Sequence, residues 1–190
     1  MEIGIPTQKT INELLKERFY IPAYQRGYRW TEQEVNDLLD DIYEFNTGAP
    51  EKPLQYCLQP LIVKKEHEGR YEVVDGQQRL TTIFIFLKLV YNMTSQEPYK
   101  LEYATRQGSQ DFLEKLSNYD GNINSENIDY YHITKAYNKI KKWLEDKVNQ
   151  GIPRFTIVST MFNIILQNTF LSGTRYRKKR FLWNYSTELI

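Results

Sequence analysis

A short polar segment, Asp75-Gly76-Gln77-Gln78-Arg79, carries the densest group of side chains that could do chemistry. A glycine lets a ligand approach the backbone closely, and the planar guanidinium of arginine matches phosphate oxygens. Glutamine amides can bind phosphate or orient water, and an aspartate can hold Mg²⁺ or orient an attacking water. The pattern therefore predicts a phosphate cradle. The alternative is a solvated turn in which Asp75 caps the following helix.

The elements predicted around this segment are compatible with a cradle and leave the alternative open. Tyr71 to Val74 reads as a strand, and a helix is expected from Gln77 or Gln78 to about Met93. This helix has almost no polar face, so we expect it to be the central buried helix. A strand, a glycine turn and a helix start present free N–H groups and the positive end of the helix dipole to an anion. The segment is not a Walker A loop, because the Gly-Lys-Ser/Thr element is absent.

A second cluster lies upstream, between Ile21 and Trp30. It combines two arginines with three large aromatic residues in a segment without helical periodicity: Tyr24, Arg26, Tyr28, Arg29 and Trp30. Arginine beside aromatic rings suits stacking on a base and contact with phosphate. The alternative is a surface loop that Tyr24 and Trp30 pin into the core.

The remaining elements follow from capping and periodicity. Capping boxes at Thr10–Glu13 and Thr31–Glu34 predict helices that end near Glu17 and Phe45. A strand over Tyr56–Lys64, with Pro60 at an edge or bulge, is expected to form a hairpin with the strand that ends at Val74. After residue 95 the signals are helical, with expected helices near 111–116, over 129–149 and over 156–167.

Composition limits the function classes. The 190 residues have a formal net charge of +1, so any site for a polyanion must be local. One cysteine permits no internal disulfide. The two histidines, His67 and His132, are too few for a common zinc site or for an HNH nuclease. No signal peptide is visible, and the longest apolar run, Ile83 to Val90, is too short to cross a membrane. We expect a cytoplasmic protein without a membrane partner.

The two motifs together resemble the N-terminal domain of GmrSD-type restriction proteins. The shared order is Ile-Pro-x-Tyr-Gln-Arg-x-Tyr-x-Trp, a helix with Leu-Leu-x-Asp-Ile, a strand pair, and Asp-Gly-Gln-Gln-Arg-Leu-Thr-Thr. The likeness is specific over residues 10–95 and only general over 96–168. Gln59-Pro60 departs from it, because relatives tend to have a glycine there, which affects the local path of the strand.

The resemblance implies an α+β fold: a ParB/sulfiredoxin-like core with a small mixed sheet and a central buried helix, followed by a helical region. It also implies binding and hydrolysis of a nucleoside triphosphate, GTP or ATP, with Mg²⁺. We divide the chain into a nucleotide-binding core (1–95), a helical extension (96–168) and an anomalous basic tail (169–190).

The candidate site residues come from both motifs. The predicted catalytic residues are Asp75, Gln77, Gln78 and Arg79, with Asp75 also the predicted metal ligand. The predicted nucleotide-binding residues are Gly76, Gln77, Arg79, Thr81, Tyr24, Gln25 and Arg26.

The tail contains a strongly basic run, Arg175 to Arg180, which by itself favours a surface that faces nucleic acid or lipid. Relatives tend to have an aromatic strand and a Phe-Asn-x-Ile/Leu-Asn element at this point. Codons can be chosen for residues 170–190 that encode such a sequence in another frame. We hypothesise that the chain from about residue 170 is a frameshift product and is truncated. The gene sequence tests this, since stops in the alternative frame would exclude it.

The predicted function is that of an NTP-hydrolysing regulatory domain in a modification-dependent DNA restriction system that acts in phage defence. Its partners would be DNA and a nuclease domain or subunit that this chain lacks. The alternatives are a module that binds nucleotide or DNA without turnover, and a truncated relic.

Overall fold

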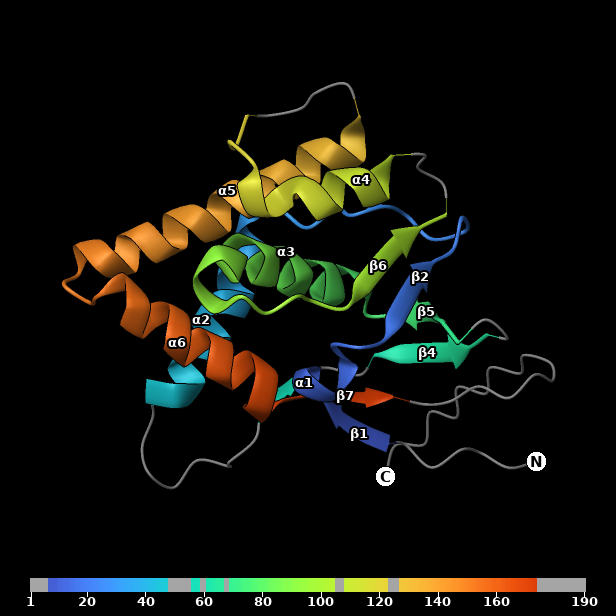
Figure 1. The fold of residues 1–190 in the computed structure, drawn as a ribbon, viewed down its shortest axis with the longest axis horizontal. Helices are drawn as coiled ribbons and strands as arrows, with labels where there is room; N and C mark the ends of the chain where they lie inside the picture. The colour runs from blue at the N-terminus through green and yellow to red at the C-terminus, as the bar shows by residue number, and fades with distance from the viewer. Residues whose placement is uncertain are drawn as a thin grey trace, which may run out of the picture.

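The computed structural model describes residues 7–47, 56–58, 61–66, 69–104, 108–122 and 127–173. Two small sheets and a set of helices alternate along this part of the chain (Figure 1). The strands are β1 (Thr7–Thr10), β2 (Arg18–Ile21), β3 (Tyr56–Leu58), β4 (Ile62–Lys65), β5 (Tyr71–Asp75), β6 (Lys100–Tyr103) and β7 (Thr169–Gly173). The helices are α1 (Ile11–Leu14), α2 (Glu32–Thr47), α3 (Gln77–Thr94), α4 (Ser109–Glu114), the 3-10 turn η1 (Lys115–Asn118), α5 (Ile128–Asn149), α6 (Arg154–Asn163) and the π-helical turn η2 (Ile164–Asn168).

The larger sheet has the strand order β4-β5-β2-β6. β2 runs parallel to both of its neighbours, β5 and β6, whereas β4 and β5 form an antiparallel pair. The predicted hairpin, the mixed sheet and the α+β class are therefore confirmed. Parallel neighbours end at the same edge of a sheet, so the segments that follow β2 and β5 leave the sheet side by side.

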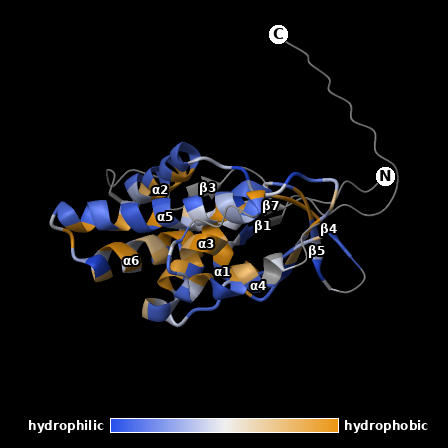
Figure 2. Cartoon of the chain, turned by 90° about the horizontal axis from the view of Figure 1, so that it is seen from above, coloured by the Kyte–Doolittle hydropathy of each residue, from blue (hydrophilic) through white to orange (hydrophobic). Residues whose placement is uncertain are grey.

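Helix α3 is the centre of the molecule, as its sequence predicts. It passes between the sheet and the other helices and is the most uniformly apolar helix in the hydropathy view (Figure 2). Seven of its apolar side chains are at most 3% exposed: Leu80, Ile83, Phe84, Ile85, Phe86, Leu87 and Val90. Burying this many large side chains ties the N-terminus of the helix to the rest of the core.

The prediction of a single strand over Tyr56–Lys64 is wrong, because the structure has two strands, β3 and β4, in this region. β3 pairs with β7 in the second, three-stranded sheet, whereas β4 pairs with β5 in the larger one. Residues 59–60, including Pro60, lie outside the described part of the chain. Apolar patterning marks both pieces as strands but cannot tell which sheet each joins, because the partner of β3 comes more than 100 residues later.

Strand β6 was missed by the sequence analysis, which expects no strand after residue 95. It lies at the edge of the larger sheet and pairs only with β2, where Leu101 is buried opposite Phe19. One hydrophobic cluster also contains residues from both sides of residue 95. The boundary predicted there therefore does not separate two cores.

The helical predictions agree better with the structure. The capping box at Thr10 and Glu13 is formed at the start of α1, which is shorter than expected. α5 spans nearly the predicted residues, and α6 begins slightly earlier than predicted, after Pro153. The basic run from Arg175 to Arg180 lies outside the described residues, and so does His67. In the described part, none of the helices is apolar over a length that would cross a membrane.

Candidate functional site

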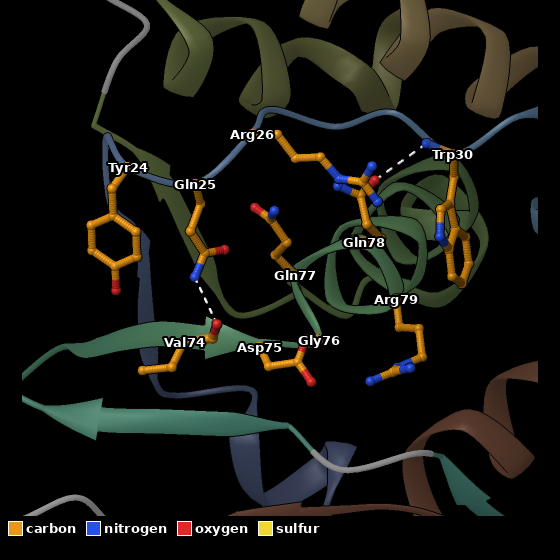
Figure 3. A pocket seen from close by; sticks show the side chains of 10 residues that line it. All are labelled: Tyr24, Gln25, Arg26, Trp30, Val74, Asp75, Gly76, Gln77, Gln78 and Arg79. Atoms are coloured by element: carbon orange, nitrogen blue, oxygen red, sulfur yellow. Dashed lines mark hydrogen bonds between the residues drawn. The ribbon is translucent and has the colours of Figure 1, made fainter. Parts of the chain in front are cut away.

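Both sequence motifs line one pocket of about 330 Å³ (Figure 3). Because β2 and β5 are parallel neighbours, the segment after Ile21 and the turn after Asp75 emerge at the same sheet edge. Such carboxyl edges are the usual place for ligands in parallel sheets. The lining residues are Tyr24, Gln25, Arg26, Trp30, Val74, Asp75, Gly76, Gln77, Gln78 and Arg79.

The N-terminus of α3 forms one end of this pocket. Gly76 is its N-cap, with a φ of 90°, a left-handed conformation that favours glycine. A Cβ at this position would lie 3.0 Å from Leu61 Cδ1 and 3.3 Å from Arg79 Nη2. The N-cap is Gly76, which has no side chain, and not Asp75. The alternative in which Asp75 caps the helix is therefore wrong. The first turn contains no acidic residue, and the positive end of the dipole is left for an anion.

The lining is locally cationic even though the whole chain is nearly neutral. It contains Arg26 and Arg79 against the single carboxylate Asp75, a difference of two minus one and hence +1. Arg26 and Asp75 are exposed, and Arg79 is half-buried with its guanidinium beside the helix start. The structure therefore brings together the two predicted phosphate-binding arginines.

Gln77 points into the pocket from the first residue of α3, between Gln25 and Gln78 (Figure 3). The residue is only 8% exposed. Among the residues that the structure describes, its Oε1 atom has no hydrogen-bond partner. A buried polar atom without a partner costs about 1–3 kcal/mol, so such atoms in folded proteins call for an explanation. A ligand or a water molecule in the pocket would supply the missing donor.

Gln78, the next residue, is fully engaged by the backbone of the upstream segment. Its Oε1 accepts from the amides of Arg29 (2.8 Å) and Trp30 (3.2 Å), and its Nε2 donates to Gly27 O (3.1 Å). This amide acts as a clamp between α3 and residues 27–30. It leaves little capacity for the predicted role of orienting a nucleophile.

Gln25 is a second clamp. Its Nε2 donates to the carbonyl oxygens of Val73 (2.6 Å) and Val74 (2.9 Å) at the end of β5. Neighbouring parallel strands cannot satisfy these groups once the sheet ends, so a side chain does it instead. Gln25 lines the pocket, where its nucleotide-binding role stays a prediction, and its two hydrogen bonds also position the upstream segment.

Tyr24 stands at the opposite end of the pocket from α3, 70% exposed. Its hydroxyl donates to Glu72 Oε1 (2.7 Å), and Glu72 Oε2 accepts from Lys64 Nζ (2.7 Å). Partial desolvation of its hydroxyl, together with the neighbouring carboxylate of Glu72, raises the pKa of Tyr24 to about 12. Burial alone would raise the pKa of Glu72, but the hydrogen bonds from Lys64 and Tyr24 outweigh it, so the net pKa is lowered.

Thr81 is not brought to the pocket. It is completely buried one turn into α3, where its hydroxyl donates to Gln77 O (2.8 Å) and lies 2.7 Å from the Tyr103 hydroxyl. The bond to Gln77 O lies within α3, and the contact with the Tyr103 hydroxyl holds the start of α3 to the end of β6. Thr81 therefore supports the turn from behind instead of contacting a ligand.

Two contributors are absent from the list of predicted site residues, although Trp30 belongs to the second cluster. Trp30 belongs to the quoted motif and lines the pocket, half-buried against the core. Asp129 comes from the start of α5 and forms an ion pair with Arg29, within the segment that the glutamines clamp. Trp30 had a signal in its motif, whereas no local pattern marks Asp129.

The pocket fits a Mg²⁺ ion that arrives with a phosphate ligand. In the described ranges no group of three or more His, Cys, Asp or Glu side chains lies together in a way that could hold a metal ion. Mg²⁺ in phosphate sites typically uses one or two carboxylates, the phosphates and water. Asp75 supplies one such carboxylate at the edge of the pocket.

The fold and the pocket define a class of protein: an α+β domain with a cationic pocket where parallel strands meet the N-terminus of a buried helix. Residues 9–183 match the family described as GmrSD restriction endonuclease, N-terminal domain, and the chain belongs to this family. It is a restriction-system protein. The match includes the helical region after residue 95. A search of curated proteins found no match.

Proposed function

We propose that the pocket binds a nucleoside triphosphate with Mg²⁺ and hydrolyses it, as a regulatory step in modification-dependent DNA restriction. In the full system the step would license DNA cleavage by a nuclease domain or subunit other than residues 1–190. DNA, in modified form, is the proposed partner of that system.

The observation that carries this proposal is the buried, unpartnered Oε1 of Gln77 beside an N-terminus of α3 that no side chain caps. The helix N-terminus and Arg79 favour an anion at this end of the pocket. A polar acceptor beside the anion is positioned to accept a hydrogen bond from a water molecule. The combination suits attack of water on a terminal phosphate better than simple anion capture.

Each residue then has a distinct task. The backbone N–H groups at Gly76 and Gln77 and the guanidinium of Arg79 stabilise the charge that develops on the transferred phosphoryl group. Gln77 Oε1 orients the attacking water. Asp75 would hold Mg²⁺, which when bound neutralises phosphate charge. Arg26 contributes a further positive charge from the opposite wall.

The direct test is phosphate release from GTP and ATP with Mg²⁺, for the wild type beside Arg79→Ala. We expect turnover to fall by about 100-fold or more, because a fixed positive charge at the transition state is typically worth that much. Arg18→Ala is the matched control. Arg18 starts β2 at the far end of the sheet and pairs with Glu102 (3.0 Å), so this variant should keep wild-type turnover.

Other results of this experiment would change the function assigned to the pocket. If nucleotides stabilise the wild type thermally without phosphate release, and Arg79→Ala removes that stabilisation, the pocket is a binding module without turnover. If neither effect occurs, the proposal is wrong. Unfolding of Arg79→Ala would show that Arg79 has a mainly structural role.

A further inference from the structure

A buried ion pair joins the pocket segment to α5, a helix that contributes no side chain to the pocket lining. Asp129 Oδ1 accepts from Arg29 Nη1, and the side chains are 4% and 27% exposed, respectively. The same Arg29 Nη1 also donates to Tyr28 O (2.6 Å). Asp129 lies in the first turn of α5, where its own backbone N–H is capped by Asn127 Oδ1 (2.8 Å). The backbone of Asp129 is therefore anchored by the helix cap, and its carboxylate by Arg29.

The carboxylate lies directly against the backbone of the segment. A Cβ at Gly27 would overlap the carboxylate group of Asp129, so only glycine permits this approach. The carbonyl of Gly27 on one side of the chain is held by Gln78 Nε2 (3.1 Å). Residues 27–30 are thus held between α3, through Gln78, and α5, through Asp129.

This bracket determines where the pocket wall lies. Arg26, which directly precedes the held residues, and Trp30, the last of them, both line the pocket. Gln25 attaches the beginning of the segment to β5, whereas the guanidinium of Arg29 donates to Asp129 of α5 and to Tyr28 O. Without Asp129, the segment would keep its clamps to β5 and α3 and lose its support from α5.

The geometry points to Asp129 as a positioning residue that sets the place of Arg26 and Trp30 in the pocket through its ion pair with Arg29. α5 thereby becomes a structural part of the site, although it supplies no lining residue. The effect on nucleotide handling rests on the proposed function, whereas the effect on the segment itself does not.

Hydrogen–deuterium exchange tests the structural claim without any ligand. The amides of Arg29 and Trp30 are bonded to Gln78, so their exchange reports the order of the segment. In Asp129→Asn we expect exchange in residues 26–30 to speed up by about tenfold, as local opening becomes easier. Unchanged exchange in this segment would overturn the proposal.

Asp40→Asn is the matched control. Asp40 also connects a carboxylate to α5, through Trp143 Nε1 (2.8 Å), but 14 residues along the helix, roughly 20 Å from Asp129. The Asp40→Asn variant should loosen the contact between α2 and α5 and leave hydrogen–deuterium exchange in residues 26–30 unchanged. If both variants speed up this segment equally, α5 acts by general stability and Asp129 has no positioning role.

Kinetics test the functional consequence. In Asp129→Asn we expect KM for the nucleotide to rise about tenfold, because misplacement of a binding wall weakens binding. kcat should change less than twofold, since Asp75, Gln77 and Arg79 belong to β5 and α3. A fall in kcat at unchanged KM would contradict the positioning role. Wild type without turnover would defeat the proposed function but leave the exchange result valid.

A second variant of the same ion pair keeps the proposal testable if Asp129→Asn does not fold. Arg29→Met keeps the apolar stem and removes the charge from the more exposed partner. It should reproduce the exchange and KM changes of Asp129→Asn, and the double variant should be no worse than either single one. Additive effects would show that the two residues act independently and would overturn the proposal.

Discussion

Two segments line the same pocket and use their polar groups in different ways. The turn from Asp75 to Arg79 is held by the strand and the helix on either side, so a side chain such as Gln77 can point into the pocket without holding the turn in place. The segment from residue 22 to residue 30 has no regular structure over most of its length. Side chains of its neighbours and its own glutamine hold it in place instead.

The two adjacent glutamines show what this difference means. Gln77 and Gln78 are equally buried, yet one has an unpartnered acceptor in the pocket and the other makes three hydrogen bonds to the upstream backbone. Most backbone groups inside a regular element bond to one another, whereas those of an irregular segment need other partners, such as side chains. Chemistry is therefore expected from the regular segment and positioning from the irregular one.

The largest effect on stability should come from Gln78→Leu. The substitution leaves two amides and one carbonyl of residues 27–30 without partners in a mostly buried place, a loss of about 3 kcal/mol in the free energy of unfolding. Urea denaturation measures it. Gln33→Leu, which removes an exposed bond within α2 to Asp37, is the control and should cost less than about 0.5 kcal/mol. An equally small loss for Gln78→Leu would remove the distinction between the two segments.

Gln77→Leu should instead lower phosphate release and leave the stability nearly unchanged. Removing an unpartnered buried acceptor should leave the free energy of unfolding unchanged or slightly higher. Phosphate release should fall by about 100-fold, or about 2.7 kcal/mol in the activation free energy, if Gln77 orients the water. Normal turnover with reduced stability would reverse the assigned roles of the two glutamines.

The smallest of these expected effects concerns the hydrogen bond between the hydroxyl of Tyr24, in the irregular segment, and the carboxylate of Glu72. The folded-state pKa of Glu72 is below its ordinary value of 4.5, because hydrogen bonds from Lys64 and Tyr24 outweigh burial. Its ionised form therefore contributes stability above about pH 4.5, and this contribution is lost as the pH falls through the lowered folded pKa.

Thermal melts between about pH 7 and pH 3 test this attachment. The Tm of wild type should fall more steeply below about pH 4.5 than that of Glu72→Gln, and at pH 7 the variant should lose about 1 kcal/mol. Glu145→Gln, an exposed change on α5, should follow the wild-type curve. Parallel acid curves for wild type and Glu72→Gln would show that Glu72 contributes no pH-dependent stability.

The sequence by itself determined the elements whose information is local. The run from Leu80 to Val90 is apolar on nearly all faces, so it had to be a buried helix. Alternation and a turn determined the hairpin of β4 and β5, and glycine before a helix determined the open N-terminus at Gly76. The types of residue in the two motifs were enough to predict a phosphate-binding pocket containing Asp75, Gln77 and Arg79 as a hypothesis.

Only the tertiary structure decided which polar groups remain free in that pocket. Hydrogen bonds are short-ranged and directional, so the roles of Gln77 and Gln78 depend on where the backbone of residues 27–30 lies. Thr81 is excluded from the pocket by the turn of the helix and by Tyr103 of β6, a strand that exists only through its pairing with β2. Asp129 joins the site from 100 residues beyond Arg29, a separation at which no sequence pattern specifies contact.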